Sequence, residues 1–180
     1  MYSSLAGGHP LLGLVRGARR CLAGQSWTWD GVRFEFLHPQ SADARPKKIN
    51  DLSCVLKVSA GAHSMLLTGD IEKPAEAELL QRSPQSLRAD VLLVPHHGSR
   101  TSSSAEFIAA VRPQAAVVPV GYRNRFGHPK TEILERYRDS GTPVWRTDQE
   151  GAVTVFLLKE RLAIKSQRRE SRRYWHDALG

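Results

Sequence analysis

Short apolar runs separated by polar turns dominate the middle of this 180-residue chain. Residues 91–94 and 115–118 are almost wholly apolar, a pattern typical of strands that are buried on both faces. Residues 32–36 alternate between apolar and charged side chains after an Asp-Gly turn, which predicts a half-buried strand in a hairpin. Residues 54–59 and 64–68 flank a glycine turn and predict a second hairpin.

Helical patterns alternate with strands in the second half of the chain. A helix over about 74–81 begins at a proline, which suits the first helical turn. Ser103 and Glu106 form the pattern of a capping box for a second helix, and Pro129 is placed to begin a third that runs through Tyr137. Strands that alternate with helices in this way predict a layered α/β domain.

The pattern divides the chain into three parts. Residues 1–26 keep no sustained period and are interpreted as the remnant of a longer element. Residues 27–165 carry the predicted strands and helices, and a chain of this length provides a sizeable core for one domain. Residues 166–180 are interpreted as a basic C-terminal tail, a frayed helix or an extended end.

Charge and hydropathy narrow the range of partners. The formal net charge is +8, and half of the excess lies beyond residue 158. A basic balance favours association with polyanions such as nucleic acid or anionic lipid head groups. No run of eighteen apolar residues predicts a membrane span, and the first residues lack the basic segment and apolar core of a signal peptide.

Several common functional motifs do not occur in the sequence. Cys21 and Cys54 provide neither a disulfide framework nor a zinc-finger spacing, and Cys54 is expected to be a buried thiol. The chain has no G-x-G-x-x-G, no phosphate loop ending in Gly-Lys-Ser/Thr and no G-x-S-x-G elbow. No nucleotide cofactor is therefore expected, and serine hydrolysis has no support.

Polar residues with metal-binding chemistry follow two neighbouring predicted strands. Asp70 comes after Thr68-Gly69, and His96 and His97 come after the next strand. Ligands bind at the carboxyl ends of strands in layered α/β folds, so we expect one shared site. The Asp70 carboxylate could bridge two divalent cations, or it could cap the helix that follows. Successive strand residues point to opposite sides, so at most one of the two histidines is expected to be a metal ligand.

A cluster of hydroxyl side chains follows the two histidines. Ser99 and Thr101, with the serines at 102–104, could hold an oxyanion at a helix N-terminus, where backbone N–H groups favour negative charge. Arg100 would add a charge-assisted contact to a phosphate. The alternative is a helix cap, which explains Ser103.

Two further segments carry candidate residues. Asn50, Asp51 and Ser53 precede a strand, where they could orient metal ligands from behind or form a plain turn. The loop around Arg123, Asn124 and Arg125 ends at His128. It could bind a phosphodiester while His128 protonates a leaving oxygen. The alternative is a solvated loop in which His128 caps the following helix.

Three segments occur together in one order: Leu-Leu-Thr-Gly-Asp at 66–70, Val-Pro-His-His-Gly-Ser-Arg-Thr-Ser-Ser at 94–103 and Asn-Arg-Phe-Gly-His-Pro at 124–129. With them the chain resembles the carboxyl-terminal metallo-β-lactamase-like domain of ComEC-type DNA-internalisation competence proteins. The resemblance implies an αββα sandwich that lacks its N-terminal part. It also implies hydrolysis of DNA phosphodiesters with two metal ions, Zn²⁺ or Mn²⁺.

The resemblance assigns expected roles to particular residues. Asp70 matches the bridging aspartate, and His97 rather than His96 matches the late histidine ligand. His128 and Ser99 match residues near the substrate. The implied partners are one strand of incoming duplex DNA and the membrane channel segments of a parent protein. That parent is expected in a bacterial inner membrane, with this domain outside the cytoplasm.

The sequence departs from the family in one feature, and this feature leads to the hypothesis that the chain is incomplete. The family's main metal motif, His-x-(His or Asp)-x-Asp-His, occurs nowhere in the sequence. Asp70 and His97 offer two ligands where a metal pair needs about four or more. We therefore expect an N-terminally truncated or frame-split chain that is inactive alone, binds metal weakly and aggregates through an exposed half-core. The alternatives are a metallo-hydrolase of a small phosphodiester or ester, and a non-catalytic DNA-docking or interaction module.

Overall fold

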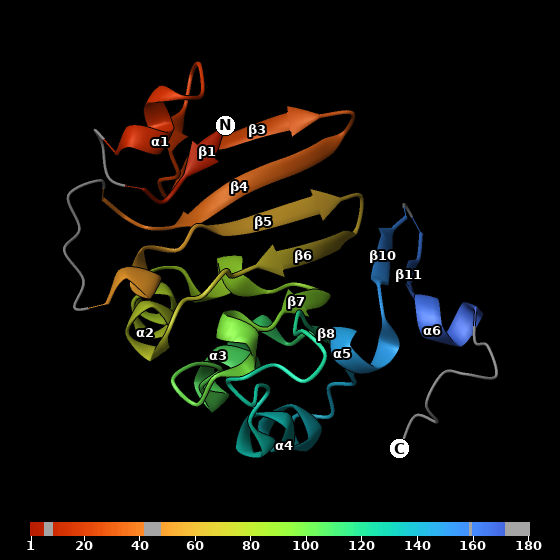
Figure 1. The fold of residues 1–180 in the computed structure, drawn as a ribbon. Coiled ribbons are helices and arrows are strands. Elements are labelled where there is room, and N and C mark those ends of the chain that lie inside the picture. Colours follow the sequence, from red (N-terminus) through yellow and green to blue (C-terminus); the bar gives the residue numbers. More distant parts are fainter. Residues whose placement is uncertain (6–8, 42–47, 159, 172–180) are drawn as a thin grey trace.

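A seven-stranded sheet forms the centre of the molecule in the computed structural model, which describes residues 1–5, 9–41, 48–158 and 160–171 (Figure 1). The strands lie in chain order, so each one hydrogen-bonds to the next. The first four are antiparallel, and Trp29 pairs with Val32 across the Asp-Gly turn. They are β3 (Ser26–Trp29), β4 (Val32–His38), β5 (Val55–Ala60) and β6 (His63–Leu67).

The second half of the sheet is parallel. β6 pairs in parallel with β7, and β8 and β9 continue in the same direction. Each parallel step needs a crossover, and right-handed crossovers between successive neighbours place their helices on one face of the sheet (Figure 1). The strands are β7 (Val91–Leu93), β8 (Ala115–Val118) and β9 (Val144–Arg146), and the helices are α2 (Lys73–Arg82), α3 (Ala105–Val111) and α4 (Thr131–Asp139).

The hydrophobic core lies between one sheet face and these three helices. Leu66 and Leu92 project from the sheet, and they meet Leu79 of α2, Phe107 of α3 and Tyr137 of α4 in one buried cluster. Full burial of a large apolar side chain contributes roughly 1.5–3 kcal/mol. This face therefore fixes the parallel strands and the loops at their ends.

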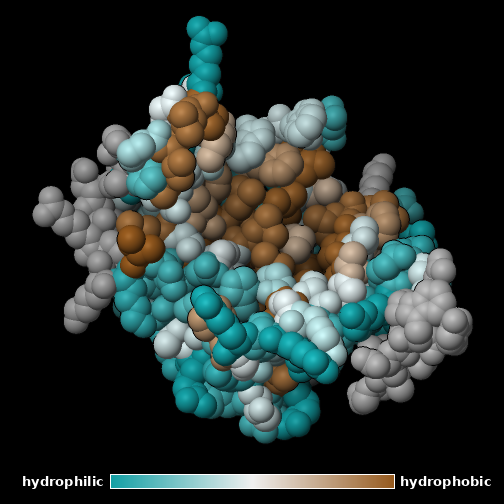
Figure 2. Space-filling model, viewed as in Figure 1, coloured by the Kyte–Doolittle hydropathy of each residue, from teal (hydrophilic) through white to brown (hydrophobic). Residues whose placement is uncertain are grey.

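The opposite face of the sheet is apolar but only partly covered. Leu66 belongs to the core, so its neighbours Met65 and Leu67 point to the other side, beside their cross-strand partners Val58 and Leu56. All four of these side chains are half-buried. Figure 2 shows a wide apolar hollow over this part of the sheet. A sheet with helices on one face and an apolar second face is the form expected of one half of a sandwich.

The N-terminal segment packs at the β3 end of the sheet. It contains β1 (Tyr2–Ser3), α1 (Pro10–Gly13) and β2 (Arg19–Arg20), and the ring of Tyr2 stacks on Trp27 at 5.1 Å. A disulfide joins Cys21 to Cys54, with their Cα atoms 5.9 Å apart. The sequence-based expectation of a buried free thiol at Cys54 was wrong. Two cysteines 33 positions apart gave no local signal, and only the packing of the segment after β2 against the start of β5 brings them together.

The C-terminal part forms a separate hairpin beside the main sheet (Figure 1). The hairpin strands come after a buried carboxylate, that of Glu150. This carboxylate accepts a hydrogen bond from Ser166 Oγ at 2.6 Å and pairs with Arg169. The elements of the C-terminal part are α5 (Thr147–Glu150), β10 (Val153–Leu157), β11 (Leu162–Ser166) and α6 (Gln167–Glu170). Of the predicted tail, residues 172–180 lie outside the described residues.

The predicted α/β class, both hairpins and the three crossover helices are confirmed. The predicted capping box was wrong. The N-cap of α3 is Ser104, whose hydroxyl accepts from the Phe107 N–H at 3.3 Å. Ser103 instead has a left-handed φ of 54° and directs its hydroxyl to the Tyr137 phenol at 3.1 Å, because the loop turns into the core there. Among the helices of the described ranges, none is long and apolar enough to cross a bilayer.

Candidate metal centre

The candidate residues gather where three parallel strands end. Asp70 follows β6, His96 and His97 follow β7, and the loop over 119–130 follows β8. Parallel neighbours present their carboxyl ends at the same edge of a sheet. The alternating pattern of the sequence was sufficient to predict this convergence.

Asp70 and His97 face each other at this edge. His97 Nε2 lies 3.4 Å from Asp70 Oδ1, and both side chains are a little under half exposed. The other ring nitrogen, Nδ1, lies 2.6 Å from the Pro119 carbonyl oxygen. A carbonyl can only accept a hydrogen bond, so Nδ1 carries a proton, and Nε2 is the ring nitrogen directed at Asp70. Metal-binding histidines are oriented by such a bond to their second nitrogen.

The strand-to-helix turn holds Asp70 away from a capping position. Helix α2 begins at Lys73 with Glu72 as its N-cap, so the alternative in which Asp70 caps this helix is wrong. The Asp70 N–H donates to Ser53 Oγ at 3.2 Å. Gly69 precedes it with φ +56°, and a Cβ at that position would lie 2.9 Å from Ser53 Cβ. The glycine therefore permits both the turn and the close approach of Ser53.

The two histidines occupy a left-handed turn rather than a strand. They lie on the 3-10 turn η3 (Pro95–Gly98), with φ 48° at His96 and 56° at His97. Their rings still diverge as predicted: His97 faces Asp70, and His96 Nδ1 lies 3.6 Å from a carboxylate oxygen of Glu72. Gly98 has φ +80°, and its carbonyl accepts from the Lys130 N–H at 3.0 Å, which ties the turn to the third loop.

The Asp70 and His97 pair fits part of a metal site. Donor atoms about 2.0–2.2 Å from a tetrahedral ion lie roughly 3.3–3.6 Å apart, and the observed separation of 3.4 Å agrees with this. Within the described ranges, however, no group of three or more His, Cys, Asp or Glu side chains could hold a metal ion. The described residues thus provide two suitable donors without the rest of a coordination shell.

A buried carboxylate beside His96 was missed by the sequence-based prediction. Glu72 is 4% exposed and pairs with the Lys48 ammonium, and Asn50 Nδ2 donates to it at 3.4 Å. Burial disfavours the charged carboxylate, but Lys48, Asn50 and His96 outweigh it and hold the pKa of Glu72 below its ordinary value. Its position two residues after Asp70 was the signal available in the sequence.

The segment before β5 supports both carboxylates from behind. It forms the 3-10 turn η1 (Ile49–Leu52), and the buried Asp51 accepts from the Glu72 N–H at 3.0 Å. Asn50 reaches Glu72 and lies 3.5 Å from His96 Nε2, and Ser53 holds the Asp70 backbone. These three predicted residues are therefore brought to the site, where they position the groups that face the crevice.

The hydroxyl cluster does not leave an open anion position at the N-terminus of α3. The Glu76 carboxylate of α2 fills it, accepting from the N–H groups of Ser103 at 2.5 Å and Ser104 at 2.9 Å. Burial raises the pKa of Glu76, and these hydrogen bonds partly offset that effect. The prediction of an oxyanion at this helix end was therefore wrong, because a residue of the chain supplies the anion. Ser99 and Thr101 lie outside it, 3.1 Å apart, with Thr101 Oγ1 3.4 Å from His96 Nδ1.

The residues predicted to bind the substrate backbone lie in different settings. The Arg100 guanidinium pairs with Glu132 of α4 at 2.8 Å. Asn124 uses both ends of its amide on the His128 backbone, at 2.7 and 2.9 Å, so it shapes the loop. Arg123 and Arg125 are exposed on the same loop.

His128 lies beside the histidine turn. Its ring centroid is 6.0 Å from that of His96, and its Nδ1 is buried with no hydrogen-bond partner among the described residues. Burial, with the positive charge of Lys130 as the next contribution, lowers the pKa of His128. The neutral ring is therefore the favoured form at neutral pH.

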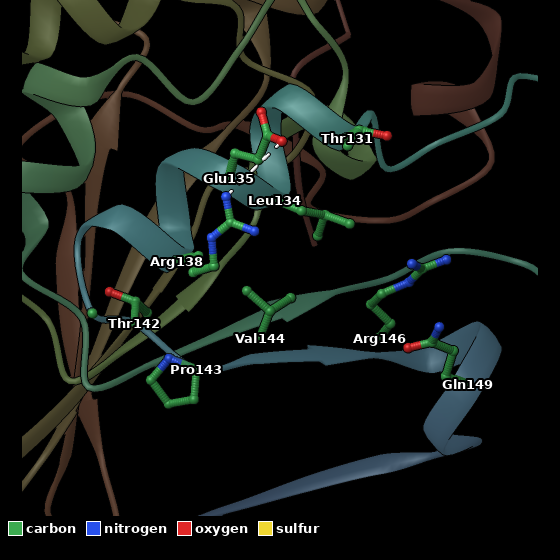
Figure 3. A pocket seen from close by; sticks show the side chains of 10 residues that line it. Thr131, Leu134, Glu135, Arg138, Thr142, Pro143, Val144, Arg146 and Gln149 are labelled. Carbon is green, nitrogen blue, oxygen red and sulfur yellow. Dashed lines mark ion pairs between the residues drawn. The ribbon is translucent and has the colours of Figure 1, made fainter. Parts of the chain in front are cut away.

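A groove elsewhere on the molecule does not include the candidate residues. It has a volume of about 640 Å³ and lies between α4 and β9, with Leu134 and Val144 in its wall and Glu135 and Arg138 paired at its rim (Figure 3). The convergence of donors, and not the presence of a hollow, therefore identifies the candidate site.

The chain is similar in sequence to bacterial competence proteins. It is 43% identical over 162 residues to "Competence protein ComA" of Neisseria gonorrhoeae, covering 88% of this chain and 22% of that protein. It is 35% identical over 161 residues to "Recombination protein 2" of Haemophilus influenzae, covering 89% and 20%. It is 38% identical over 122 residues to "ComE operon protein 3" of Bacillus subtilis, covering 68% and 15%. The chain thus spans about a fifth or less of the length of these relatives.

Two other comparisons complete the picture. No protein-family profile matches the chain. A crystal structure from Thermotoga maritima, assigned in its title to the metallo-β-lactamase superfamily of zinc-dependent hydrolases, shares 17% identity at a TM-score of 0.39, over 66% of this chain and 59% of that one.

Proposed function

We propose that this chain is part of the metal-dependent hydrolase domain of a ComEC-type competence protein, and that the domain cleaves DNA phosphodiesters during DNA uptake. The observation that carries the proposal is the 3.4 Å approach of His97 Nε2 to Asp70 Oδ1, with His97 oriented by the Pro119 carbonyl. Similarity to competence proteins over nearly the whole chain supports the DNA-uptake setting.

In this proposal Asp70 and His97 hold divalent metal, Zn²⁺ or Mn²⁺, in a site of two ions. The bound metal would polarise the phosphodiester and activate water. Ser53 and Pro119 keep the two donors oriented, and the Asp70 carboxylate and the His97 ring would hold divalent metal if it is bound there. His96 contacts Glu72 and Thr101, and in this proposal it binds substrate or supports the turn and is not a metal ligand.

His128 is the proposed proton donor to the leaving oxygen. Donation requires the protonated imidazolium, so the ring would first take up a proton. The ring lies beside the histidine turn, and the bonds from Asn124 to the His128 backbone fix its position. Ser99 contributes through Thr101, to which its hydroxyl is bonded. Arg100, Arg123 and Arg125 supply positive charge for the DNA backbone.

We further propose that the remaining metal ligands come from protein outside this chain. Two donors are too few for a metal pair, and the apolar sheet face in Figure 2 is suited to packing against a second sheet. The relatives are about four times as long as this chain, which leaves room for such a segment and for membrane channel segments. The chain alone is then inactive and binds metal weakly.

The proposed location is outside the cytoplasm, on a parent protein of the bacterial inner membrane. The Cys21–Cys54 disulfide supports it, because disulfides persist in oxidising compartments and are rare in the cytosol. The competence relatives supply the membrane-uptake setting.

The proposal is tested by substitution in a longer protein that contains this chain. Asp70→Asn and His97→Ala should each lower DNA cleavage roughly 100-fold or more, because even the loss of a group that supports a metal ligand costs 10–100-fold. Asp139→Asn is the matched control, since that exposed carboxylate ends α4 far from the crevice. Full cleavage by Asp70→Asn would refute the site.

A non-catalytic DNA-docking module is the second candidate, and the two-donor limit favours it for the chain alone. The hydrolase and the docking module can be distinguished with the purified chain. It is titrated with Mn²⁺ or Zn²⁺ and assayed for binding and cleavage of duplex and single-stranded DNA. Docking predicts DNA binding that survives chelator and Asp70→Ala. Stoichiometric metal with cleavage by the isolated chain would contradict the proposed incompleteness.

A further inference from the structure

The loop that follows β8 carries two exposed aromatic side chains next to the candidate site. Tyr122 is 59% exposed and Phe126 is 61% exposed, and an arginine accompanies each ring. The Arg123 guanidinium lies 5.2 Å from the Tyr122 ring centroid, and that of Arg125 lies 4.9 Å from the Phe126 centroid. Large rings held in water with cations on their faces are suited to binding flat, anionic ligands.

The loop is held in place while its rings stay exposed. Asn124 closes it through two hydrogen bonds to the His128 backbone, and Lys130 Nζ donates to the Phe126 carbonyl at 2.8 Å. The Asn124 N–H also donates to the Gly121 carbonyl at 3.2 Å. This ordering lowers the entropy cost of binding, because the rings do not need to be immobilised by the ligand.

A series of rings connects the loop to the candidate metal centre. Phe126 stacks on His128 with a 16° angle between planes and 6.0 Å between centroids, and His128 lies 6.0 Å from His96. A planar group placed on Phe126 would therefore extend the two-ring stack of Phe126 and His128, which lies beside the histidine turn. The exposed Arg123 and Arg125 of the same loop would be available to its phosphate.

We propose that Tyr122 and Phe126 form a stacking platform for unpaired bases, so that the strand at this site is bound as single-stranded DNA. This rests on the proposed function and adds its substrate form. Aromatic rings stack on every base regardless of sequence, whereas bases inside a duplex are already stacked and hidden. Between residues 121 and 127 the loop has aromatic and cationic side chains without aliphatic ones, which favours bases over the acyl region of a membrane.

The test compares oligonucleotides that differ only in bases. Fluorescence anisotropy in EDTA measures binding of the chain to labelled oligo-dT and to an abasic oligomer with the same number of phosphates. The chain should prefer oligo-dT about tenfold. Phe126→Ala and Tyr122→Ala should each weaken oligo-dT binding about five- to tenfold, with the slope of affinity against salt unchanged, because the phosphate contacts remain.

Two variants serve as controls. Phe126→Trp keeps a ring and should retain the preference for bases. Trp29→Ala removes another exposed aromatic, 69% exposed at the β3–β4 turn, and should change neither affinity. Equal affinity of the chain for both oligomers, or unchanged oligo-dT binding by Phe126→Ala, would overturn the platform. If Phe126→Ala weakens binding to anionic vesicles and leaves DNA binding unchanged, the loop binds a lipid surface, and the stacking platform is likewise rejected.

Failure of this inference can be told from failure of the proposed function. Binding in EDTA does not involve cleavage, so the platform stands or falls without metal. If Asp70→Asn in the longer protein abolishes cleavage while Phe126→Ala has no effect on oligo-dT, the hydrolase remains and the stacking platform is rejected. If both oligomers bind equally and weakly and Asp70→Asn cleaves normally, both are rejected.

Discussion

At Gly98 the backbone leaves no room for a side chain. Its φ is +80°, and a Cβ there would lie 2.5 Å from the Cβ of Pro129. This contact joins the histidine turn to the loop that carries His128. A single residue thus sets the spacing between two of the three strand ends at the candidate site.

Gly98→Ala should therefore destabilise the chain and displace the histidine turn. Left-handed strain alone costs of order 1–3 kcal/mol, and the clash with Pro129 adds to it. Urea unfolding measures the change. Gly121→Ala is the matched control, because a Cβ there meets nothing within 4 Å, and it should shift stability by less than about 0.5 kcal/mol. Equal midpoints for the two variants would contradict this account.

Residue by residue, the sequence was most informative where chemistry follows a strand. Asp70 and His97 could be predicted to meet because both come directly after strands of one parallel set. Glu76 could not be placed in the same way. It occupies the helix face that also carries Leu79, but only the tertiary packing of α2 against α3 shows that its carboxylate fills the N-terminus of α3.

At the scale of elements, buried ion pairs fix the parts that the main sheet does not hold. Glu150 ends α5, and it binds both Ser166 at the end of β11 and Arg169 in α6. Burial disfavours its charge, but Arg169 and Ser166 outweigh that effect and lower the pKa of Glu150 below its ordinary value. The ionised carboxylate thus holds the C-terminal hairpin to the rest of the domain.

Glu150→Gln should lower stability by about 1–3 kcal/mol at pH 7, because a buried charged hydrogen bond is lost. A carboxyl group with a depressed folded pKa stabilises above its unfolded pKa, and this contribution disappears as pH falls through the folded pKa. The deficit of Glu150→Gln relative to the parent should therefore shrink below about pH 4.5. Thermal unfolding across this range measures it. Glu170→Gln, which removes an exposed pair with Lys165, should have little effect at any pH. A deficit of Glu150→Gln that stays constant from pH 7 to the lowest pH at which both proteins still fold would contradict the role of Glu150.

Elements were easier to predict than their ends. Hydrophobic periodicity located all three crossover helices, whereas the start of α3 depended on Ser103 turning its hydroxyl toward the buried Tyr137. The disulfide depended on contacts between segments 33 positions apart. In each case the missing information was the long-range contact that overrides a local pattern.

For the whole molecule, the uncovered sheet face governs solution behaviour. Val58 and Met65 are half-buried cross-strand partners of β5 and β6, on the sheet face that is opposite the core. Figure 2 shows an apolar hollow over this part of the sheet. An apolar surface of this kind promotes association. The chain should bind the dye ANS and self-associate, and Val58→Lys should reduce both without unfolding the core. Light scattering and dye fluorescence measure the effects, with Thr28→Lys at an exposed position as control. A dye-free, monodisperse parent chain would contradict the prediction.

The disulfide is the second whole-molecule constraint. It closes a loop across 33 positions, and chain-entropy arguments give a stabilisation of about 3–4 kcal/mol. Replacing both Cys21 and Cys54 by serine should lower the urea midpoint accordingly. Thiol titration of the oxidised chain should find no reactive group, as both sulfurs are bonded. Two titratable thiols in the folded, oxidised chain would rule out the bond.

The apolar face and the candidate metal centre share a border, since β6 and β7 contribute their faces to one and their ends to the other. A protein layer that settles on the strands brings its own loops to Asp70 and His97 in the same step. Assembly of the two layers and completion of the metal site would then be one event. Under the proposed function, such a domain would cut DNA only after both layers have met.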